Sequence, residues 1–477
     1  MNAPIARVFG VIVVMFALLI VWTSRWTVFD AQALRDNPLN QRTVIDEERI
    51  DRGEILAADG TVLAKSVPAP DHTFTRQYPT GSLFSQAIGY SVVQSGQEAG
   101  LELSDGQYLR GVNTGISAII GQLGGGTQVG DNVDTSLDPK AQRLALQLLD
   151  GRDGSVVAID PRTGAVKVMI SLPTYNDNAP DANCGAPGCK QNDATQAQDV
   201  PGSTFKVVST TAALDSGKFT PDSVVNGNSP LLVSGVPLEN DSNQSWGPQT
   251  VTTALTYSIN TIYAQIAQDT GRATMTEYMK RFGFYSKPPI DLPPDELIPS
   301  EPWTPSTPSR PYPPGSPNED IGRIGIGQGG LLVTPLQMAM VVAAVANGGR
   351  LMAPHLTSSV VNPDGQTILT VKPTLYSQVM KSSTAQEISQ MMRKVVEEGT
   401  GQPAELGGLS VAGKTGTASL GATGSGLTEP WFIGFAPATN PQIAIAVTID
   451  RTDNGYGGTV AAPIASAVMK QLLSDNG

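Results

Sequence analysis

The sequence predicts a mixed α/β protein in which a central mixed sheet is faced by helices and preceded by a smaller β-rich domain. Three observations support this prediction. Runs rich in β-branched residues occur early, at 155–171, and late, at 431–450, with helical patterns between and after them. Residues 26–150 instead contain short apolar runs that glycines interrupt. Strands at both ends of a region with helices between them favour one sheet covered by helices.

The composition is that of a folded, acidic protein. The chain has 477 residues, of which 40% are hydrophobic and 16% charged, and this balance argues against wholesale disorder. The length accommodates two or three domains. The formal net charge of −12 argues against nucleic acid or an anionic lipid surface as the main partner. Small molecules or a polymer are therefore the expected substrates.

The N-terminus carries an uncharged apolar stretch, Val8–Trp22, directly after Arg7. Fifteen residues are few for a membrane span and many for the core of a signal peptide, so a cleaved signal is the alternative. We expect a cytoplasmic tip and a retained single-pass membrane anchor at residues 1–25, because Trp22 and Trp26 can lie at the membrane interface. The remainder of the chain is then expected outside the cytoplasm.

The next region, residues 26–150, is expected to form the first folded domain. Its stretch 52–66 has two apolar runs around an Asp-Gly turn, which predicts a β-hairpin. The pattern at 139–151 predicts a helix, because proline stands in its first turn and glycine at its end. This helix is expected to lead into a second domain at 151–477.

A proline-rich segment stands apart from these patterns. Twelve of the 36 prolines fall between Pro288 and Pro317, and such a stretch cannot be a regular helix or a central strand. It could be a linker between domains. Because the strand patterns on both sides belong to one predicted sheet, we expect a surface excursion instead.

The two cysteines, Cys184 and Cys189, are close together in CGAPGC. We expect either a local disulfide, which suits an exported loop, or two free thiols. A metal site is not expected, because only His72 and His355 could supply further nitrogen ligands and both are distant in sequence.

One serine and one lysine stand at helical spacing. Ser203 and Lys206, in PGSTFK, begin a pattern that predicts a helix over 203–217. Residues three apart share a helix face, so the amine could take the proton of the hydroxyl. That requires a neutral lysine, whose pKa burial and a second cation nearby would lower. Taken alone, the pair is better explained as a helix cap and a solvated lysine.

The second cation can come from Lys-Thr-Gly-Thr at Lys414–Thr417, which is predicted to be a strand with a glycine where a ligand can approach the backbone. Its lysine could lower the pKa of Lys206 and attract a substrate carboxylate. The amides of Thr417 and Ser203 could together form an oxyanion hole. On its own, the stretch could be the end of an edge strand.

A third element is Ser258 followed two residues later by Asn260. The hydroxyl could relay a proton towards a leaving amine, and the side-chain amide could hold a peptide. A junction between two helices is the alternative for this element alone. The order of the three elements, at separations of 55 and 156 residues, favours one catalytic site.

Together these motifs resemble those of penicillin-binding proteins, acyl-serine transferases marked by Ser-x-x-Lys, Ser-x-Asn and Lys-Thr-Gly in that order. Further segments match the class B, monofunctional type: RGEILAADGTVLA, GLE, VVAIDPRTGAVKVM, IGQGGLLVTPLQMAM and WFIGFAPA. The resemblance covers nearly the whole chain and is greatest to actinobacterial members. It implies a penicillin-binding, serine β-lactamase-like transpeptidase domain at 151–477 and an elongated, non-catalytic pedestal of the dimerisation type at 26–150.

The resemblance also implies a role for each motif residue in D,D-transpeptidation of peptidoglycan stem peptides. Ser203 is expected to be the nucleophile, Lys206 the general base and Ser258 the proton relay. The residues expected to bind the substrate are Asn260, Lys414, Thr415, Gly416 and Thr417.

The family resemblance implies no metal and no organic cofactor. It implies peptidoglycan stem peptides as substrate, β-lactams as inhibitors, and partners such as a membrane glycan polymerase and the machinery of cell-wall synthesis and division. Three alternatives use related chemistry: a D,D-carboxypeptidase, a membrane-bound β-lactam receptor and a serine β-lactamase. The pedestal disfavours the carboxypeptidase, and the length and anchor disfavour the β-lactamase. A receptor would require a cytoplasmic effector, for which few residues precede the apolar stretch.

Overall fold

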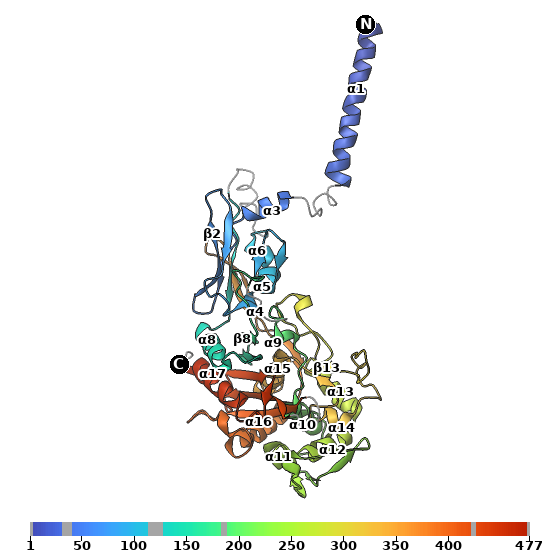
Figure 1. Ribbon diagram of the computed structural model, residues 1–477, viewed down its shortest axis with the longest axis vertical. Coiled ribbons are helices and arrows are strands. Elements are labelled where there is room, and N and C mark those ends of the chain that lie inside the picture. The colour runs from blue at the N-terminus through green and yellow to red at the C-terminus, as the bar shows by residue number, and fades with distance from the viewer. Residues whose placement is uncertain (1–2, 31–40, 113–126, 183–187, 421–425, 475–477) are drawn as a thin grey trace.

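A computed structural model shows a body of two domains and a separate N-terminal helix (Figure 1). The structure describes residues 3–30, 41–112, 127–182, 188–420 and 426–474.

The sheet of the larger domain has the order β19-β20-β21-β7-β8. The described neighbouring strands in this sheet all run antiparallel, whereas a mixed sheet was predicted, and the short β22 (Thr452–Asp453) pairs with the start of β20. The strands are β19 (Ala412–Ser419), β20 (Leu427–Ala436), β21 (Ile443–Ile449), β7 (Gly154–Ile159) and β8 (Val166–Leu172).

Helices cover both faces of this sheet, as predicted. On one face lie α8 (Pro139–Leu149) and α17 (Ala461–Ser474), which also pack against each other. On the other lies α15 (Pro335–Ala346), and α10 (Lys206–Asp215) packs against α15. Strand β7 is buried at every residue, because its side chains point alternately into two hydrophobic cores. That explains why its sequence is a continuous apolar run.

The remaining described elements are shorter or lie around this core. The helices are α9 (Asp193–Gln196), α11 (Val251–Thr256), α12 (Asn260–Thr270), α13 (Arg272–Arg281), α14 (Ile321–Ile324) and α16 (Ser382–Glu397). The strands are β9 (Val224–Asn226), β10 (Leu231–Val233), β11 (Val236–Leu238), β12 (Pro248–Thr250), β13 (Glu301–Pro302), β14 (Leu331–Leu332), β15 (Arg350–Met352) and β18 (Leu375–Gln378).

The smaller domain is built on a sheet of order β17-β16-β6-β1-β2-β3. The predicted hairpin is present as β1 and β2, which pair antiparallel, while β1 and β6 pair in parallel. The strands are β1 (Ile55–Leu56), β2 (Val62–Pro68), β3 (Phe74–Gln77), β6 (Asn132–Thr135), β16 (Thr357–Val361) and β17 (Thr367–Thr370). Beside the sheet lie α3 (Gln41–Glu48), α4 (Ser85–Ile88), α5 (Gly100–Ser104), α6 (Gly106–Leu109) and the β4–β5 pair (Ser91–Val92 and Gln97–Glu98).

Two segments pack in a domain other than the one to which the expected boundary at residue 150 assigns them. Strands β16 and β17 come from the second half of the chain, yet they complete the sheet of the first domain. Helix α8 precedes residue 150, yet it packs on β8 and α17. The carboxylate of Asp138 caps this helix by accepting from the backbone N–H groups of Lys140 and Ala141. The two domains therefore exchange segments across the junction.

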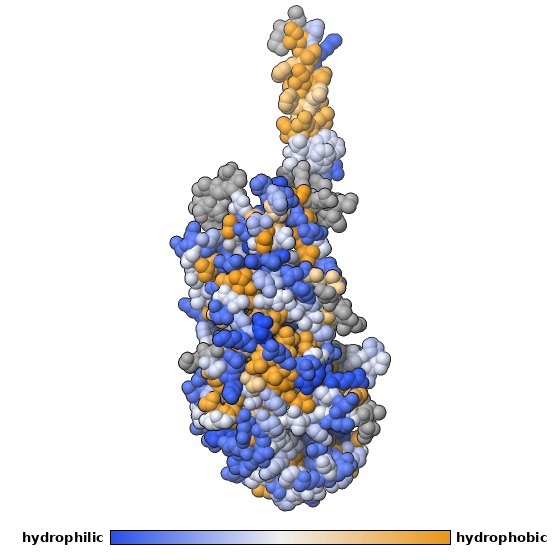
Figure 2. Space-filling model, turned by 60° about the vertical axis from the view of Figure 1, so that its left-hand side comes forward, coloured by the Kyte–Doolittle hydropathy of each residue, from blue (hydrophilic) through white to orange (hydrophobic). Residues whose placement is uncertain are grey.

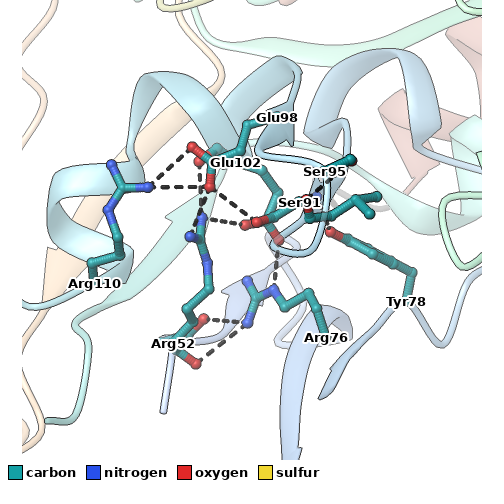
Figure 3. A network of polar contacts seen from close by, with 10 residues as sticks. Arg52, Arg76, Tyr78, Ser91, Ser95, Glu98, Glu102 and Arg110 are labelled. Atoms are coloured by element: carbon teal, nitrogen blue, oxygen red, sulfur yellow. Dashed lines mark hydrogen bonds and ion pairs between the residues drawn. The ribbon is translucent and has the colours of Figure 1, made fainter. Parts of the chain in front are cut away.

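A network of buried charges ties the first domain together (Figure 3). The Arg52 guanidinium contacts the carboxylates of Glu98 and Glu102, each at 2.8 Å. Arg76 reaches the other oxygen of Glu102 at 2.6 Å, and Arg110 contacts Glu98 at 3.0 Å. These residues come from separate elements, so the network fixes the hairpin against the segment that carries GLE.

The proline-rich segment is a surface excursion only in its second half. Residues 304–318 are mainly exposed or half-buried, but Leu292 and Leu297 are buried. The carboxylate of Asp291 accepts from the backbone N–H groups of Leu356 and Thr357. The first half of the segment therefore packs against the junction of the two domains, because its carboxylates satisfy backbone donors there.

Helix α1 (Ala3–Ser24) is apolar apart from Arg7 and its last two residues, and none of its residues is buried by the described part of the chain. Figure 2 shows it as a nearly continuous hydrophobic rod. It is long and apolar enough to cross a membrane, which fits the predicted anchor. The predicted pairing of Cys184 with Cys189 involves a residue outside the described part of the chain, and it stays a prediction.

Candidate active site

Ser203 lies in a short 3-10 turn, Gly202–Phe205, that leads directly into α10. Gly202 has a φ of +50°, a conformation that favours glycine, and its N–H donates to the carbonyl of Gly327 at 3.1 Å. A Cβ atom on Gly327 would lie 1.9 Å from the carbonyl oxygen of Gly202. The IGQGG segment is therefore in direct contact with the turn that carries Ser203, and only glycine fits at position 327.

Lys206 is fully buried, and its ammonium group points to the second motif. Its Nζ donates to the backbone carbonyl of Ser258 at 2.7 Å, lies 3.1 Å from the hydroxyl of Ser258, and donates to Oδ1 of Asn260 at 2.7 Å. The structure thus brings the first two motifs together. Among the described residues, no hydrogen bond joins the hydroxyl of Ser203 to Lys206, so that predicted contact is absent from this conformation.

The second motif occupies the junction between α11 and α12. Ser258 has a φ of +60°, a left-handed conformation that costs a serine about 1–3 kcal/mol. It is held there because Ser258 and Ile259 donate backbone hydrogen bonds to the end of α11. Asn260 begins α12, and its Nδ2 donates to the carbonyl of Glu239 at 3.1 Å. The strained turn presents both side chains to Lys206.

A supporting residue of this junction, Asn240, was not foreseen from the sequence. Its Oδ1 accepts from the backbone N–H of Thr261 at 2.9 Å, and its Nδ2 donates to the carbonyls of Gly227 and Gln244. It therefore fixes the start of α12 next to Asn260. No motif marks it, since an asparagine between two short strands is common in loops.

The third motif lies on β19, the edge strand of the sheet as described, and packs against the turn of Ser203. A Cβ atom on Gly416 would lie 2.8 Å from the carbonyl oxygen of Pro201, so glycine is required for this contact. The Thr417 hydroxyl accepts from the backbone N–H of Gly457 at 3.1 Å. The strand and turn that carry the two expected oxyanion-hole amides are therefore in contact.

Lys414 and Thr415 complete this wall of the site. The Lys414 side chain is fully buried, and its Nζ donates to the carbonyl of Thr415 at 2.9 Å. The hydroxyl of Thr415 shares a hydrogen bond with that of Thr400 at 2.6 Å. Neither lysine of the site forms an ion pair with a carboxylate in the part of the chain that the structure describes.

Both buried lysines of the site have pKa values below the usual value for lysine. Burial is the main cause of the low pKa of Lys206, and the charge of Lys414 lowers that pKa further, while Asp241 acts weakly in the opposite sense. Burial lowers the pKa of Lys414 to about 7. The centre of the Tyr263 ring is 5.5 Å from Nζ of Lys206, so the ring partly stabilises a positive charge on that nitrogen. Lys206 is thus suited to act as a base at neutral pH.

No metal centre accompanies these groups. In the described ranges, no set of three or more histidine, cysteine, aspartate or glutamate side chains is placed to hold a metal ion. The arrangement provides a hydroxyl and two buried amines with lowered pKa values, one of them on the strand at the sheet edge. These groups suit acyl transfer through a serine ester.

Comparisons with known proteins agree with this geometry. The model of the penicillin binding protein transpeptidase domain matches residues 154–470, and that of the penicillin binding protein A dimerisation domain matches residues 52–133. The chain is 32% identical over 508 aligned residues to the peptidoglycan D,D-transpeptidase PbpA of Mycolicibacterium smegmatis, with 100% of both chains covered. The chain belongs to the penicillin-binding protein transpeptidase family. The predicted family and fold class are therefore confirmed.

Solved structures of penicillin-binding proteins are similar over most of the chain. The ceftriaxone acyl-enzyme complex of penicillin-binding protein A from M. tuberculosis is 28% identical with a TM-score of 0.78, covering 89% of this chain and 98% of that one. The D,D-transpeptidase domain of a peptidoglycan glycosyltransferase from Eggerthella lenta is 30% identical, with the same TM-score and coverage of 90% and 99%. The predicted likeness to an actinobacterial penicillin-binding protein A is thus confirmed.

Proposed function

We propose that Ser203 is the residue of this penicillin-binding protein that the peptide substrate acylates, with Lys206 as its general base. The protein is a peptidoglycan D,D-transpeptidase that works through an acyl-serine intermediate and is inactivated by β-lactams. The observation that supports the assignment is the placement of Lys206, whose buried Nζ contacts both side chains of the second motif.

The proposed acylation begins with transfer of the Ser203 proton to neutral Lys206. The serine oxygen then attacks the carbonyl carbon of the D-alanyl-D-alanine bond, and the amides of Ser203 and Thr417 stabilise the developing oxyanion. As the C–N bond breaks, Ser258 relays the proton from Lys206 to the leaving amine of D-alanine. Substrate binding must bring Ser203 and Lys206 into hydrogen-bonding distance, since catalytic contacts often tighten only in the complex.

The other motif residues are proposed to bind the donor peptide. Asn260 holds its backbone, because Oδ1 and Nδ2 offer an acceptor and a donor beside Ser258. Lys414, Thr415, Gly416 and Thr417 receive the terminal carboxylate and the peptide edge. In deacylation, an amine from a second stem peptide attacks the ester carbonyl and gives its proton to Lys206 through Ser258. The bond from the acyl carbon to the Ser203 oxygen then breaks as Lys206 returns a proton to that oxygen, which restores the free serine and the neutral lysine.

We also propose that α1 anchors the protein as a single span with the catalytic domain outside the cytoplasm. Its apolar side chains support an anchor, because they face no protein core. The domain around β1 and β2 is the proposed docking site for a membrane glycan polymerase and for the machinery of wall synthesis and division. Its family model, a dimerisation domain, supports a role in association.

The test combines mass spectrometry with turnover. The purified protein is incubated with penicillin G, digested and analysed for the labelled peptide, and Ser203→Ala serves as the control. An adduct on Ser203 that is lost in this variant supports the assignment, and labelling that survives the substitution contradicts it.

A second measurement separates transpeptidation from D,D-carboxypeptidation. A stem-peptide thioester is turned over with and without a D-amino acid as acceptor. Product that contains the acceptor supports transpeptidation, whereas hydrolysis that the acceptor does not affect supports the carboxypeptidase.

A further inference from the structure

Glu429 lies directly behind the catalytic centre. It stands on β20, opposite Ala418 of β19 and one position beyond the partner of Thr417. Its side chain is buried, with a relative exposure of 3%. A buried carboxyl group next to the strand that binds substrate requires an explanation, because burial of an unpaired carboxylate is costly.

The carboxyl group joins two parts of the site that are distant in sequence. One oxygen, Oε1, accepts from the indole N–H of Trp431 at 2.8 Å, and Trp431 pairs with Gly416 across the sheet. The other, Oε2, accepts a longer hydrogen bond of 3.4 Å from the backbone N–H of Val200. Val200 lies three residues before Ser203, so Glu429 links the nucleophile segment to the strand beside β19.

The surroundings of Glu429 are acidic. The carboxyl groups that interact electrostatically with one another here are Asp199, before the Ser203 turn, Asp193, on α9, Asp450, after β21, and Asp153, before β7. Within the described ranges, no lysine, arginine or histidine forms an ion pair with any of them or with Glu429. Among the described residues, the cluster is therefore not neutralised by a paired cation.

Several buried polar atoms of the acidic cluster and of the neighbouring strands β7 and β21 have no hydrogen-bond partner among the described residues. Oδ2 of Asp199 and Oδ1 of Asp450 are buried without a hydrogen bond, as are the hydroxyls of Ser155 and Thr448. Ser155 and Thr448 pair across β7 and β21 and are fully buried. Burial raises the pKa of Glu429 to about 8 and that of Asp450 to about 7, and it raises the pKa of Asp199 as well. Glu429 is therefore protonated at neutral pH.

We propose that Glu429 is a positioning residue for the acylation of Ser203 and that it acts as a neutral carboxylic acid. In this form it holds Val200 and Trp431 without adding charge to the acidic cluster. When it ionises, the two N–H groups favour its charge, but within the described ranges that charge is buried with no paired cation and lies near Asp199, which directly precedes Val200 in the chain. The segment before Ser203 then loses its support, and acylation slows. This inference rests on the proposed role of Ser203 as the acylated residue.

The test is the pH dependence of acylation by penicillin G between pH 6 and pH 10. In the unsubstituted protein, the acylation rate constant is expected to fall above pH 8, by about tenfold per pH unit as for a single ionisation. Glu429→Gln, which is always neutral and still accepts from Trp431, is expected to lose this fall. Glu429→Ala is expected to be about a hundredfold slower at every pH, because the segment is misplaced.

Glu319→Gln is the matched control. Glu319 is also a buried glutamate, with a pKa that burial raises to about 7, but its backbone carbonyl contacts Arg272 and it lies in another part of the domain. Its variant is expected to keep the pH profile of the parent. Circular dichroism of each variant shows whether it is folded. If Glu429→Ala does not fold, the pH profile of Glu429→Gln still tests the inference.

Two outcomes overturn the inference. A fall above pH 8 that persists unchanged in Glu429→Gln assigns the ionisation to another group, such as Lys414, and removes the proposed role. A folded Glu429→Ala that is acylated as fast as the parent does the same. If no variant and not even the parent is labelled on Ser203, the proposed function fails instead, so the two failures are distinguishable by the position of the adduct.

Discussion

The expected pedestal and the candidate active site both bury positively charged side chains, but the partners of these side chains differ. In the pedestal, Arg52 and Arg76 are almost inaccessible and both contact the carboxylate of Glu102. In the catalytic centre, Lys206 and Lys414 are equally inaccessible, but they contact carbonyl, amide and hydroxyl groups rather than carboxylates.

The consequence is a different charge state at the same burial. The two arginines hold the pKa of Glu102 below its usual range despite full burial, and Glu98 and Glu102 raise the pKa of Arg52. The lysines have no such partner, so burial lowers their pKa values. Burial alone does not determine whether a group is charged. A paired charge stabilises the fold, and an unpaired amine with a low pKa is suited to act as a base.

The largest effect should come from Lys206→Met, which removes the base and leaves the volume filled. We expect the acylation rate constant with penicillin G to fall by about 10²–10⁴-fold, the usual contribution of a general base, while the free energy of unfolding is unchanged or increased because a desolvated amine is removed. Stopped-flow labelling and urea unfolding check both parts. A variant that is labelled at the parental rate would remove Lys206 from the mechanism.

In the pedestal, Glu102→Gln should cost stability rather than chemistry. Arg76 loses its paired carboxylate and Arg52 keeps only that of Glu98, and an uncompensated buried charge costs about 3–5 kcal/mol. Urea unfolding measures the loss, and the rate of acylation per folded molecule is expected to stay parental. Asp59→Asn, at the exposed hairpin turn, is the control and should change stability by less than about 0.5 kcal/mol. Equal effects of the two substitutions would show that the network contributes little.

A smaller effect, on the catalytic side, is a shift in the pH profile when Lys414 is changed. The charge of Lys414 lowers the pKa of Lys206. Lys414→Met should therefore move the ascending limb of the plot of acylation rate against pH to higher pH, in addition to any decrease of the maximal rate. Lys414→Arg keeps a cation and should leave the limb in place. The pH of half-maximal rate is the measurement, and identical limbs in the two variants would argue against coupling of the two lysines.

The smallest effect concerns stability at alkaline pH. Lys414 has a folded pKa of about 7 and an unfolded value near 10.5, so the unfolded chain binds more protons between these values and stability rises with pH through that window. Lys414→Met lacks this contribution. Its melting temperature should therefore exceed that of the parent most at pH 7, and the difference should shrink towards pH 10.5. Calorimetry at several pH values checks this, and a constant difference would contradict the lowered pKa.

Much of the candidate site was predictable because its residues lie in short sequence motifs. Ser203 with Lys206, Ser258 with Asn260, and Lys414–Thr417 were each singled out, and the structure brings the elements that carry them together. Glu429 and Asn240 were not foreseen. Glu429 had a weak signal, a lone acid two residues before the apolar run that begins at Trp431. Neither residue belongs to a motif, and each also contacts a backbone group distant in sequence, Val200 for Glu429 and Thr261 for Asn240.

The sequence by itself determined the local elements, the three motifs and the family, because helix caps, apolar periodicity and motif spacing act over short distances. Only the tertiary structure decided which sheet the strands of 357–370 join, which half of the proline-rich segment is buried, and which buried charges have partners. These depend on contacts between residues hundreds of positions apart. The free energy of a buried charge is set by what surrounds it in space, and no local pattern records that.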